Sequence, residues 1–97
     1  MLRLNYTYHD APQWVDVQFE YTRFNPDDPQ APRDTLCFIT KPDGTMKTGS
    51  AQLHHLDHFN RVVGRKIAFG RALKNITQDP SERREVWNAY FGMVNYR

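Results

Sequence analysis

The segment from residue 61 to residue 74 combines arginines with small residues, a pattern suited to an anionic ligand. On a helical wheel, residues spaced by four form a ridge of small side chains: Gly64, Ala68 and Ala72. Arginines flank that ridge: Arg61, Arg65 and Arg71. A small ridge lets a partner approach the helix backbone, and guanidinium groups bind phosphate or carboxylate in a bidentate manner. The pattern predicts either a basic binding face or close packing against the second helix or the sheet, with the arginines paired to acids.

Acidic residues and a tryptophan gather in the first third of the chain. Asp16 and Glu20 share the polar side of a predicted strand with Trp14, and Asp27 and Asp28 follow in the adjoining loop. An exposed tryptophan is a common anchor of protein interfaces, and the carboxylates suit a basic host groove or mimicry of nucleic acid. We predict that this acidic face contacts protein.

Histidines crowd the start of the predicted first helix: His54, His55 and His58. If the helix begins early, His54 and His58 lie one turn apart, a spacing that metal sites use. A third ligand would have to come from Asp57, His9 or Cys37. Because there is no second pair of Cys or His ligands, we favour a polar helix entry capped by Asp57 and expect neither a metal ion nor a cofactor.

Signals of catalysis are weak. Cys37 lies between Leu36 and Phe38 in an apolar run, where a thiol is normally inert packing. The sequence contains no glycine-rich phosphate loop, no nucleophile elbow and no acid pair at metal spacing. We therefore predict that the protein is not an enzyme, and that Cys37 is buried and unreactive.

Several aromatic residues are candidates for a platform on which single-stranded nucleic acid stacks. They are Tyr6, Tyr8, Trp14, Tyr21, Tyr90 and Tyr96. Such residues more often complete a small core, with the exception of Trp14 on the polar side of its strand.

Hydrophobic periodicity predicts four strands. Alternation indicates half-buried strands at 2–8 and 15–22, joined by a turn at Asp10-Ala11-Pro12. The apolar run 36–39 predicts a strand buried on both faces, and a weaker strand is expected at about 45–53, after the turn Pro42-Asp43-Gly44. Prolines at 26, 29 and 32 predict an extended loop at 25–34.

Two helices follow the strands. The first spans about 57–76, and we expect its apolar arc to pack on the sheet with Phe59, Val63 and Ile67 in the core. In the second, Asp79 is placed to cap the helix, Pro80 suits the first position, and Glu82 has the capping-box position. The predicted fold is α+β: an N-terminal four-stranded antiparallel sheet packed against two C-terminal helices.

Size and charge limit the possible functions. Ninety-seven residues predict a single domain, 1–97. Residues 1–57 carry a net charge of −3 and residues 58–97 one of +5, a split that suggests one face for a polyanion or an acidic partner. One cysteine, no secretory leader and no apolar run of about 18 residues predict a cytoplasmic protein that does not bind a membrane.

Three motifs resemble a pattern found in small uncharacterised phage-encoded proteins. They are Gly49-x-Ala51, His55-x-Asp57-x-Phe59 and the helix Gly64-Arg65-x-Ile67-Ala68-x-x-Arg71-Ala72-Leu73. The match covers roughly residues 35–91, and family members often carry a Cys-His-Pro-type segment where this chain has residues 53–56. The resemblance implies a phage or prophage origin and a bacterial host cytosol, without assigning an activity.

Small phage accessory proteins are mostly non-catalytic binders. We therefore expect an anti-CRISPR or other anti-defence inhibitor that binds a host protein or ribonucleoprotein and modulates a host nucleic-acid machine. The alternative is a small phage nucleic-acid-binding protein that uses the basic helix 57–76, and a metal-dependent enzyme is a distant third. The sequence leaves the oligomeric state and the target open. An acidic sheet face would favour the inhibitor, whereas a continuous basic face would favour direct binding of nucleic acid.

Overall fold

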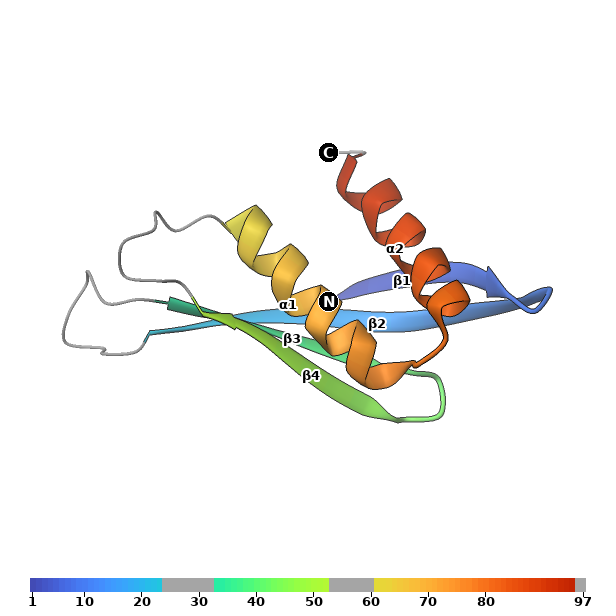
Figure 1. Ribbon diagram of the computed structural model, residues 1–97, viewed down its shortest axis with the longest axis horizontal. Helices are drawn as coiled ribbons and strands as arrows, with labels where there is room; N and C mark the ends of the chain where they lie inside the picture. The colour runs from blue at the N-terminus through green and yellow to red at the C-terminus, as the bar shows by residue number, and fades with distance from the viewer. Residues whose placement is uncertain (24–32, 53–60, 96–97) are drawn as a thin grey trace.

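A computed structural model describes residues 1–23, 33–52 and 61–95 and confirms the predicted α+β fold. The strands are β1 (Leu2–Tyr8), β2 (Ala11–Arg23), β3 (Arg33–Thr40) and β4 (Met46–Gln52), and the helices are α1 (Arg61–Ile76) and α2 (Pro80–Asn95). The strands pair in chain order as one antiparallel sheet, and both helices lie on the same side of it (Figure 1).

The turn between β1 and β2 is tighter than predicted. His9 and Asp10 both have positive φ angles, 52° and 59°, as the two central residues of a type I′ hairpin turn do. Asp is among the residues that tolerate this left-handed backbone. The turn therefore lies at His9-Asp10, and Pro12, expected in the turn, is instead part of β2 opposite Thr7.

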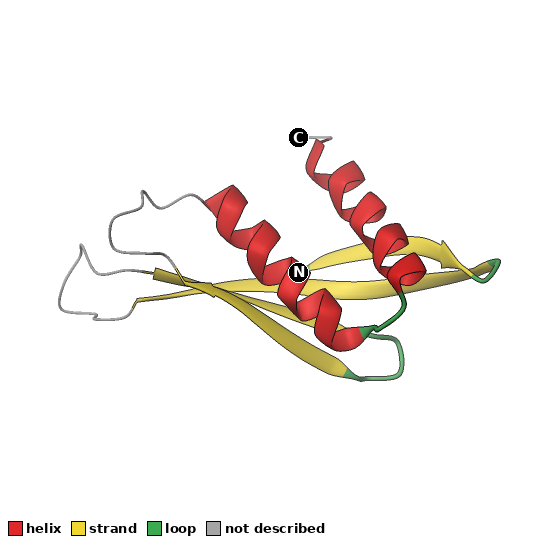
Figure 2. Cartoon of the chain, in the orientation of Figure 1, coloured by secondary structure: helices red, strands yellow, loops and turns green. Residues whose placement is uncertain are grey.

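Side chains alternate between the two faces of the sheet, as the pleat requires. The face beneath the helices contributes buried residues from every strand: Leu4, Tyr6, Val15, Val17, Thr35, Cys37, Ile39 and Ala51. No described helix covers the other face (Figure 2). Leu36 and Phe38 point to that bare face and are half-buried, so the prediction that this strand is buried on both faces is wrong.

The rotation of α1 differs from the prediction. Ala68 and Ala72 are completely buried, together with Phe69 and Leu73, whereas Ile67 is 43% exposed. Val62 and Val63 are also about half exposed, at 52% and 50%, and Phe59 lies outside the described residues. The small ridge therefore packs on the sheet together with Phe69 and Leu73 of the predicted apolar arc, whereas Val62, Val63 and Ile67 of that arc do not.

Close backbone packing explains this rotation. A Cβ atom added to Gly49 of β4 would lie 2.5 Å from the carbonyl oxygen of Ala68 and closer still to the nitrogen of Ala72. A Cβ atom on Gly64 would lie 2.7 Å from Oγ1 of the buried Thr35. Because glycine and alanine meet at this contact, α1 approaches β4 more closely than larger side chains would allow. Of the two alternatives for the ridge, the structure therefore shows packing against the sheet.

The start of α2 is held on β1. Oδ1 of Asp79 accepts a hydrogen bond from the backbone nitrogen of Ser81 at 2.9 Å, which confirms the predicted cap. The predicted capping box is incomplete, because Glu82 turns to the sheet side: Oε2 accepts from the Tyr6 hydroxyl at 3.3 Å, and Oε1 lies 3.5 Å from Nζ of Lys41. The Tyr8 hydroxyl also donates to Asp79. Burial, with the nearby Glu82 charge, raises the pKa of Tyr6 to about 12.

Candidate functional site

Of the three arginines predicted to share one exposed face, Arg65 and Arg71 point in different directions. Nε of Arg65 donates to the Tyr21 hydroxyl at 2.5 Å, beneath α1, and its guanidinium lies 5.8 Å from the ring centre of Phe19. Nη1 of Arg71 donates to the carbonyl oxygen of Ser50 on β4 at 2.6 Å. Arg61 begins α1, and its side chain is outside the description. The side chain of Arg65 therefore packs against β2 beneath α1, whereas that of Arg71 is exposed at the β4 edge of the sheet.

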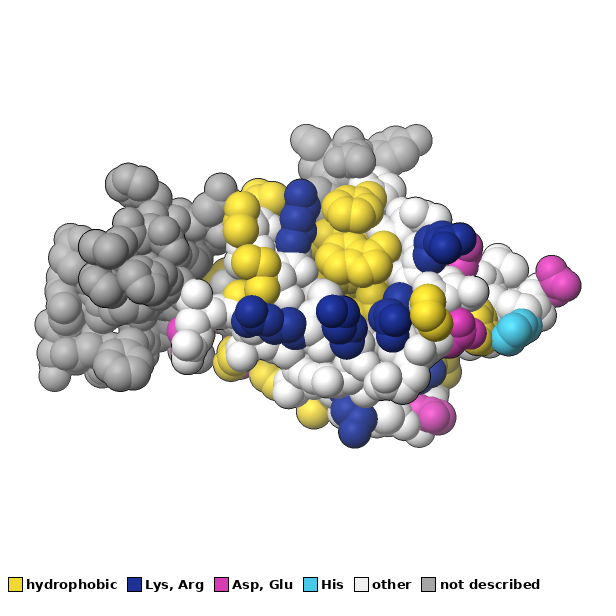
Figure 3. Space-filling view, viewed as in Figure 1, with side chains coloured by type: hydrophobic (Ala, Val, Ile, Leu, Met, Phe, Trp, Pro, Cys, Tyr) yellow, Lys and Arg dark blue, Asp and Glu magenta, His cyan; other side chains and the backbone are white. Residues whose placement is uncertain are grey.

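A different set of cations surrounds a notch on the outer side of the helices, which we call the helix notch. It has a volume of about 290 Å³ and lies between the last turns of α1 and the first turns of α2. Its basic lining residues are Lys66, Arg71, Lys74 and Arg83. Its remaining lining residues are Ile67, Gly70 and Trp87. Figure 3 shows Lys and Arg side chains bordering an apolar area over the helices.

The charge of the helix notch is not neutralised by the described part of the chain. Among those residues, the ion pairs are Arg3 with Asp16 and Lys41 with Glu82, neither of which involves the notch. Helix α1 contains five basic residues and no acid. Nη1 of Arg83 donates to the carbonyl oxygen of Thr77 at 3.0 Å, which fixes that side chain without cancelling its charge. The notch therefore attracts anions.

An aromatic cluster supports one side of the notch. Trp87 packs edge-on against Phe69, with ring centres 4.8 Å apart, and stacks on Phe91 at 5.3 Å and 19°. Gly70 makes room for this tryptophan, since a Cβ atom there would lie 3.2 Å from Cζ2 of Trp87. Phe91 remains 38% exposed, and Nζ of Lys66 lies 5.7 Å from its ring centre. Cationic and aromatic groups therefore occupy one continuous surface.

The predicted acidic face lies on the uncovered side of the sheet, but it is less acidic than the sequence suggested. Nε of Arg3 donates to Oδ1 of Asp16 at 2.8 Å, and Nη2 donates to Oδ2 at 3.1 Å. Hydrogen bonding to Arg3 lowers the pKa of Asp16. The same guanidinium lies 3.8 Å from the ring centre of the half-buried Trp14. Arg3, from the neighbouring strand, thus contacts two of the predicted contact residues, Trp14 and Asp16.

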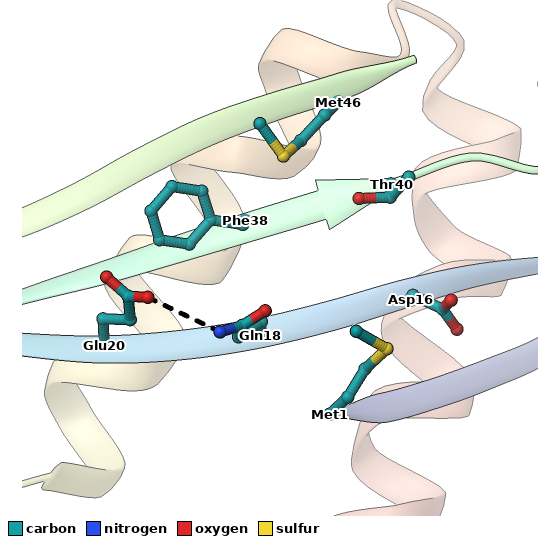
Figure 4. A pocket seen from close by; sticks show the side chains of 7 residues that line it. All are labelled: Met1, Asp16, Gln18, Glu20, Phe38, Thr40 and Met46. Carbon is teal, nitrogen blue, oxygen red and sulfur yellow. Dashed lines mark hydrogen bonds between the residues drawn. The ribbon is translucent and has the colours of Figure 1, made fainter. Parts of the chain in front are cut away.

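A shallow pocket of about 180 Å³ lies on this face of the sheet (Figure 4). Asp16 and Glu20 line it, together with Gln18, whose Nε2 donates to Oε1 of Glu20 at 3.5 Å. The other lining residues are Met1, Phe38, Thr40 and Met46. Asp27 and Asp28, predicted to extend the acidic face, lie outside the described residues.

The remaining chemical candidates are limited. Cys37 is completely buried, as predicted, and burial raises the pKa of its thiol to about 12. Within the ranges that the structure describes, no three His, Cys, Asp or Glu side chains gather closely enough to hold a metal ion. His54, His55, Asp57 and His58 are outside those ranges. No described helix is both long and apolar enough to cross a membrane.

Sequence reasoning missed Lys66, Lys74 and Arg83 as site residues. Lys66, Gly70 and Lys74 recur at intervals of four, on the side of α1 opposite the small ridge, and this spacing was a usable signal. Arg83 carried no such signal, because its position depends on how α2 lies beside α1.

Comparisons with known proteins add no relative. The chain matches no family model, and neither the curated proteins nor the solved structures contain a significant match to it. The candidate site therefore has to be interpreted from its own geometry and charge.

Proposed function

We propose that the protein is a non-catalytic nucleic-acid-binding protein that contacts phosphate groups through the helix notch. The observation that carries this proposal is the grouping of Lys66, Arg71, Lys74 and Arg83 in a notch with no acidic lining residue. Lys and Arg supply most of the phosphate contacts of nucleic-acid-binding proteins.

The state of these cations also supports a polyanion as the ligand. Lys66 and Lys74 are exposed, and neither forms an ion pair with a described carboxylate, so a phosphate would displace no acidic partner. Binding releases counterions from the nucleic acid, which makes the affinity fall with salt. The buried thiol of Cys37, with its raised pKa, fits a protein that does not use that residue as a nucleophile.

A charge-removal experiment tests this function. We expect Lys66→Ala with Lys74→Ala to weaken binding to a mixed-sequence oligonucleotide and to reduce the salt dependence, by about 0.7–0.9 in log–log slope for each phosphate that is no longer bound. Lys47→Ala with Arg84→Ala is the matched control, because it also removes two exposed bases and neither residue lines the notch. Fluorescence anisotropy at several salt concentrations gives the slopes. Equal reductions of affinity in the two variants would contradict a site at the notch.

A second candidate function is the phage-derived inhibitor expected from the sequence, docking on a host protein through the uncovered sheet face. The observation that favours it is the shallow pocket whose lining combines the apolar residues Phe38 and Met46 with the carboxylates of Asp16 and Glu20. Such a surface suits a basic or amphipathic side chain of a protein partner.

Charge reversal separates this candidate from the first. Asp16→Lys with Glu20→Lys should abolish binding to a host protein and leave nucleic-acid binding at the helix notch intact. Both residues are on the bare sheet face, so the fold should survive. Loss of nucleic-acid binding in this variant, with the fold retained, would argue against two separate surfaces.

A further inference from the structure

The surface at the helix notch is divided between cationic and apolar groups. Lys66, Arg71, Lys74 and Arg83 provide the charge. Beside them are apolar side chains that the fold does not bury: Ile67 is 43% exposed and Phe91 38%. Phosphate alone gives these apolar side chains nothing to contact, whereas a ligand with an apolar surface next to its charge contacts both kinds of group.

Unpaired nucleotides combine these two properties. In a duplex the bases are stacked inside and the outer surface is phosphate and sugar, whereas a single strand can turn its bases toward aromatic side chains. The ring of Phe91 is held by its stack on Trp87, and so it is already positioned for a base. The notch volume of about 290 Å³ also suits a small group such as part of one nucleotide.

We propose that the helix notch binds single-stranded nucleic acid, with an unpaired base against Phe91 and the adjoining phosphates on Lys66, Lys74 and Arg83. This inference rests on the proposed function, because it names the class of nucleic acid that the same site takes. Charge complementarity argues against a second copy of the chain, since two such surfaces would bring equal numbers of cations together.

The experiment compares single strands of equal charge with one another and with a duplex of the same length, which carries about twice their charge. The probe is a strand of about twelve thymidines, within the range of ~4–16 nucleotides that single-strand sites occupy. It is compared with its uridine counterpart, with an abasic strand of the same length and with a duplex of the same length. A Trp14→Phe variant leaves Trp87 as the tryptophan that reports on the notch, because these are the two tryptophans of the chain.

We expect the thymidine strand to bind roughly 5- to 150-fold more tightly than the abasic strand, as one stacked base predicts. It should also bind more tightly than the duplex and change the fluorescence of Trp87. Equal affinity for the thymidine and abasic strands, or preference for the duplex, would overturn the inference and leave the proposed function standing. No binding of any probe would overturn both. The uridine arm shows whether DNA or RNA is preferred.

Variants of Phe91 test the stacked ring itself. Phe91→Leu keeps an apolar side chain but removes the ring, and it should abolish most of the preference for the thymidine strand over the abasic strand. Phe91→Tyr keeps the ring and should restore the preference. Absence of the preference in both variants, with the fold intact, would assign Phe91 a merely structural role. Thermal unfolding of each variant supplies the check on folding.

Discussion

Gly49 allows the backbone of α1 to lie directly against β4. A methyl group at this position would lie 2.5 Å from the Ala68 carbonyl oxygen, and the atoms it meets belong to backbone that cannot rotate away. We expect Gly49→Ala to destabilise the protein by about 1–3 kcal/mol or more, because the helix must move outward. Urea denaturation followed by circular dichroism measures the change in the free energy of unfolding.

Gly92 supplies the control for that substitution. It lies in α2, and a Cβ atom there would have no neighbour within 4 Å. Gly92→Ala should therefore stabilise the protein by up to about 1 kcal/mol through helix propensity alone. If Gly49→Ala left the stability unchanged while Gly92→Ala raised it, the result would contradict the close backbone contact between α1 and β4.

At the scale of the element, the rotation of α1 reverses an expectation about Ile67. The apolar arc predicted this residue to be in the core, whereas 43% of it is exposed and Leu73 is 1% exposed. We expect Leu73→Ala to cost about 2–5 kcal/mol and Ile67→Ala less than about 1 kcal/mol. Chemical denaturation of the two variants checks the order. A larger destabilisation by Ile67→Ala would support the rotation that the apolar arc predicted.

The sequence predicted the elements better than their orientation. Alternating apolar residues predict β1 and β2 from each strand's own sequence, and Asp79-Pro80 predicts the start of α2 from local capping chemistry. Both features are local, so the sequence alone predicts them. The rotation of α1 depends on Gly49, which lies far away in the sequence and meets Ala68 and Ala72 through tertiary packing. A glycine within a predicted strand is typical of a close backbone approach, but it does not indicate which helix residues it meets.

The candidate site was also predictable only where it depends on the local geometry of a single strand or helix. Trp14, Asp16 and Glu20 share one face because strand geometry fixes it. The pairing of Asp16 with Arg3 depends on the register of β1 and β2, where these two residues lie opposite each other. The helix notch combines residues of two helices, and single-helix patterns do not report how helices lie side by side.

At the scale of the whole molecule, the core should make stability sensitive to alkaline pH. Burial raises the pKa of Cys37 from 9.0 to about 12 and that of Tyr6 from 10.0 to about 12. Both groups release their protons less readily in the folded protein than in the unfolded chain. The free energy of unfolding is therefore highest at pH values below 9.0, where both groups are protonated in both states. It falls as the pH rises toward about 12, by up to about 1.4 kcal/mol per pH unit for each group.

Denaturation at several pH values between about 8 and 11 measures this effect. Cys37→Ala should reduce the slope of unfolding free energy against pH above about pH 9, even though the smaller side chain lowers stability at every pH. The slope, not the absolute stability, is the quantity to compare. Identical slopes for the two proteins would mean that the thiol ionises equally well in both states.

The hydrogen bonds between α1 and β4 have a consequence for self-association. Arg71 covers the carbonyl oxygen of Ser50, and Nδ2 of Asn75 covers that of Thr48 at 2.9 Å, so the outer edge of β4 is partly blocked. A strand edge with open carbonyls is a template on which another chain can add a strand. If Arg71 turns from Ser50 to a phosphate, that template is exposed, so ligand binding and protection against aggregation compete for one side chain.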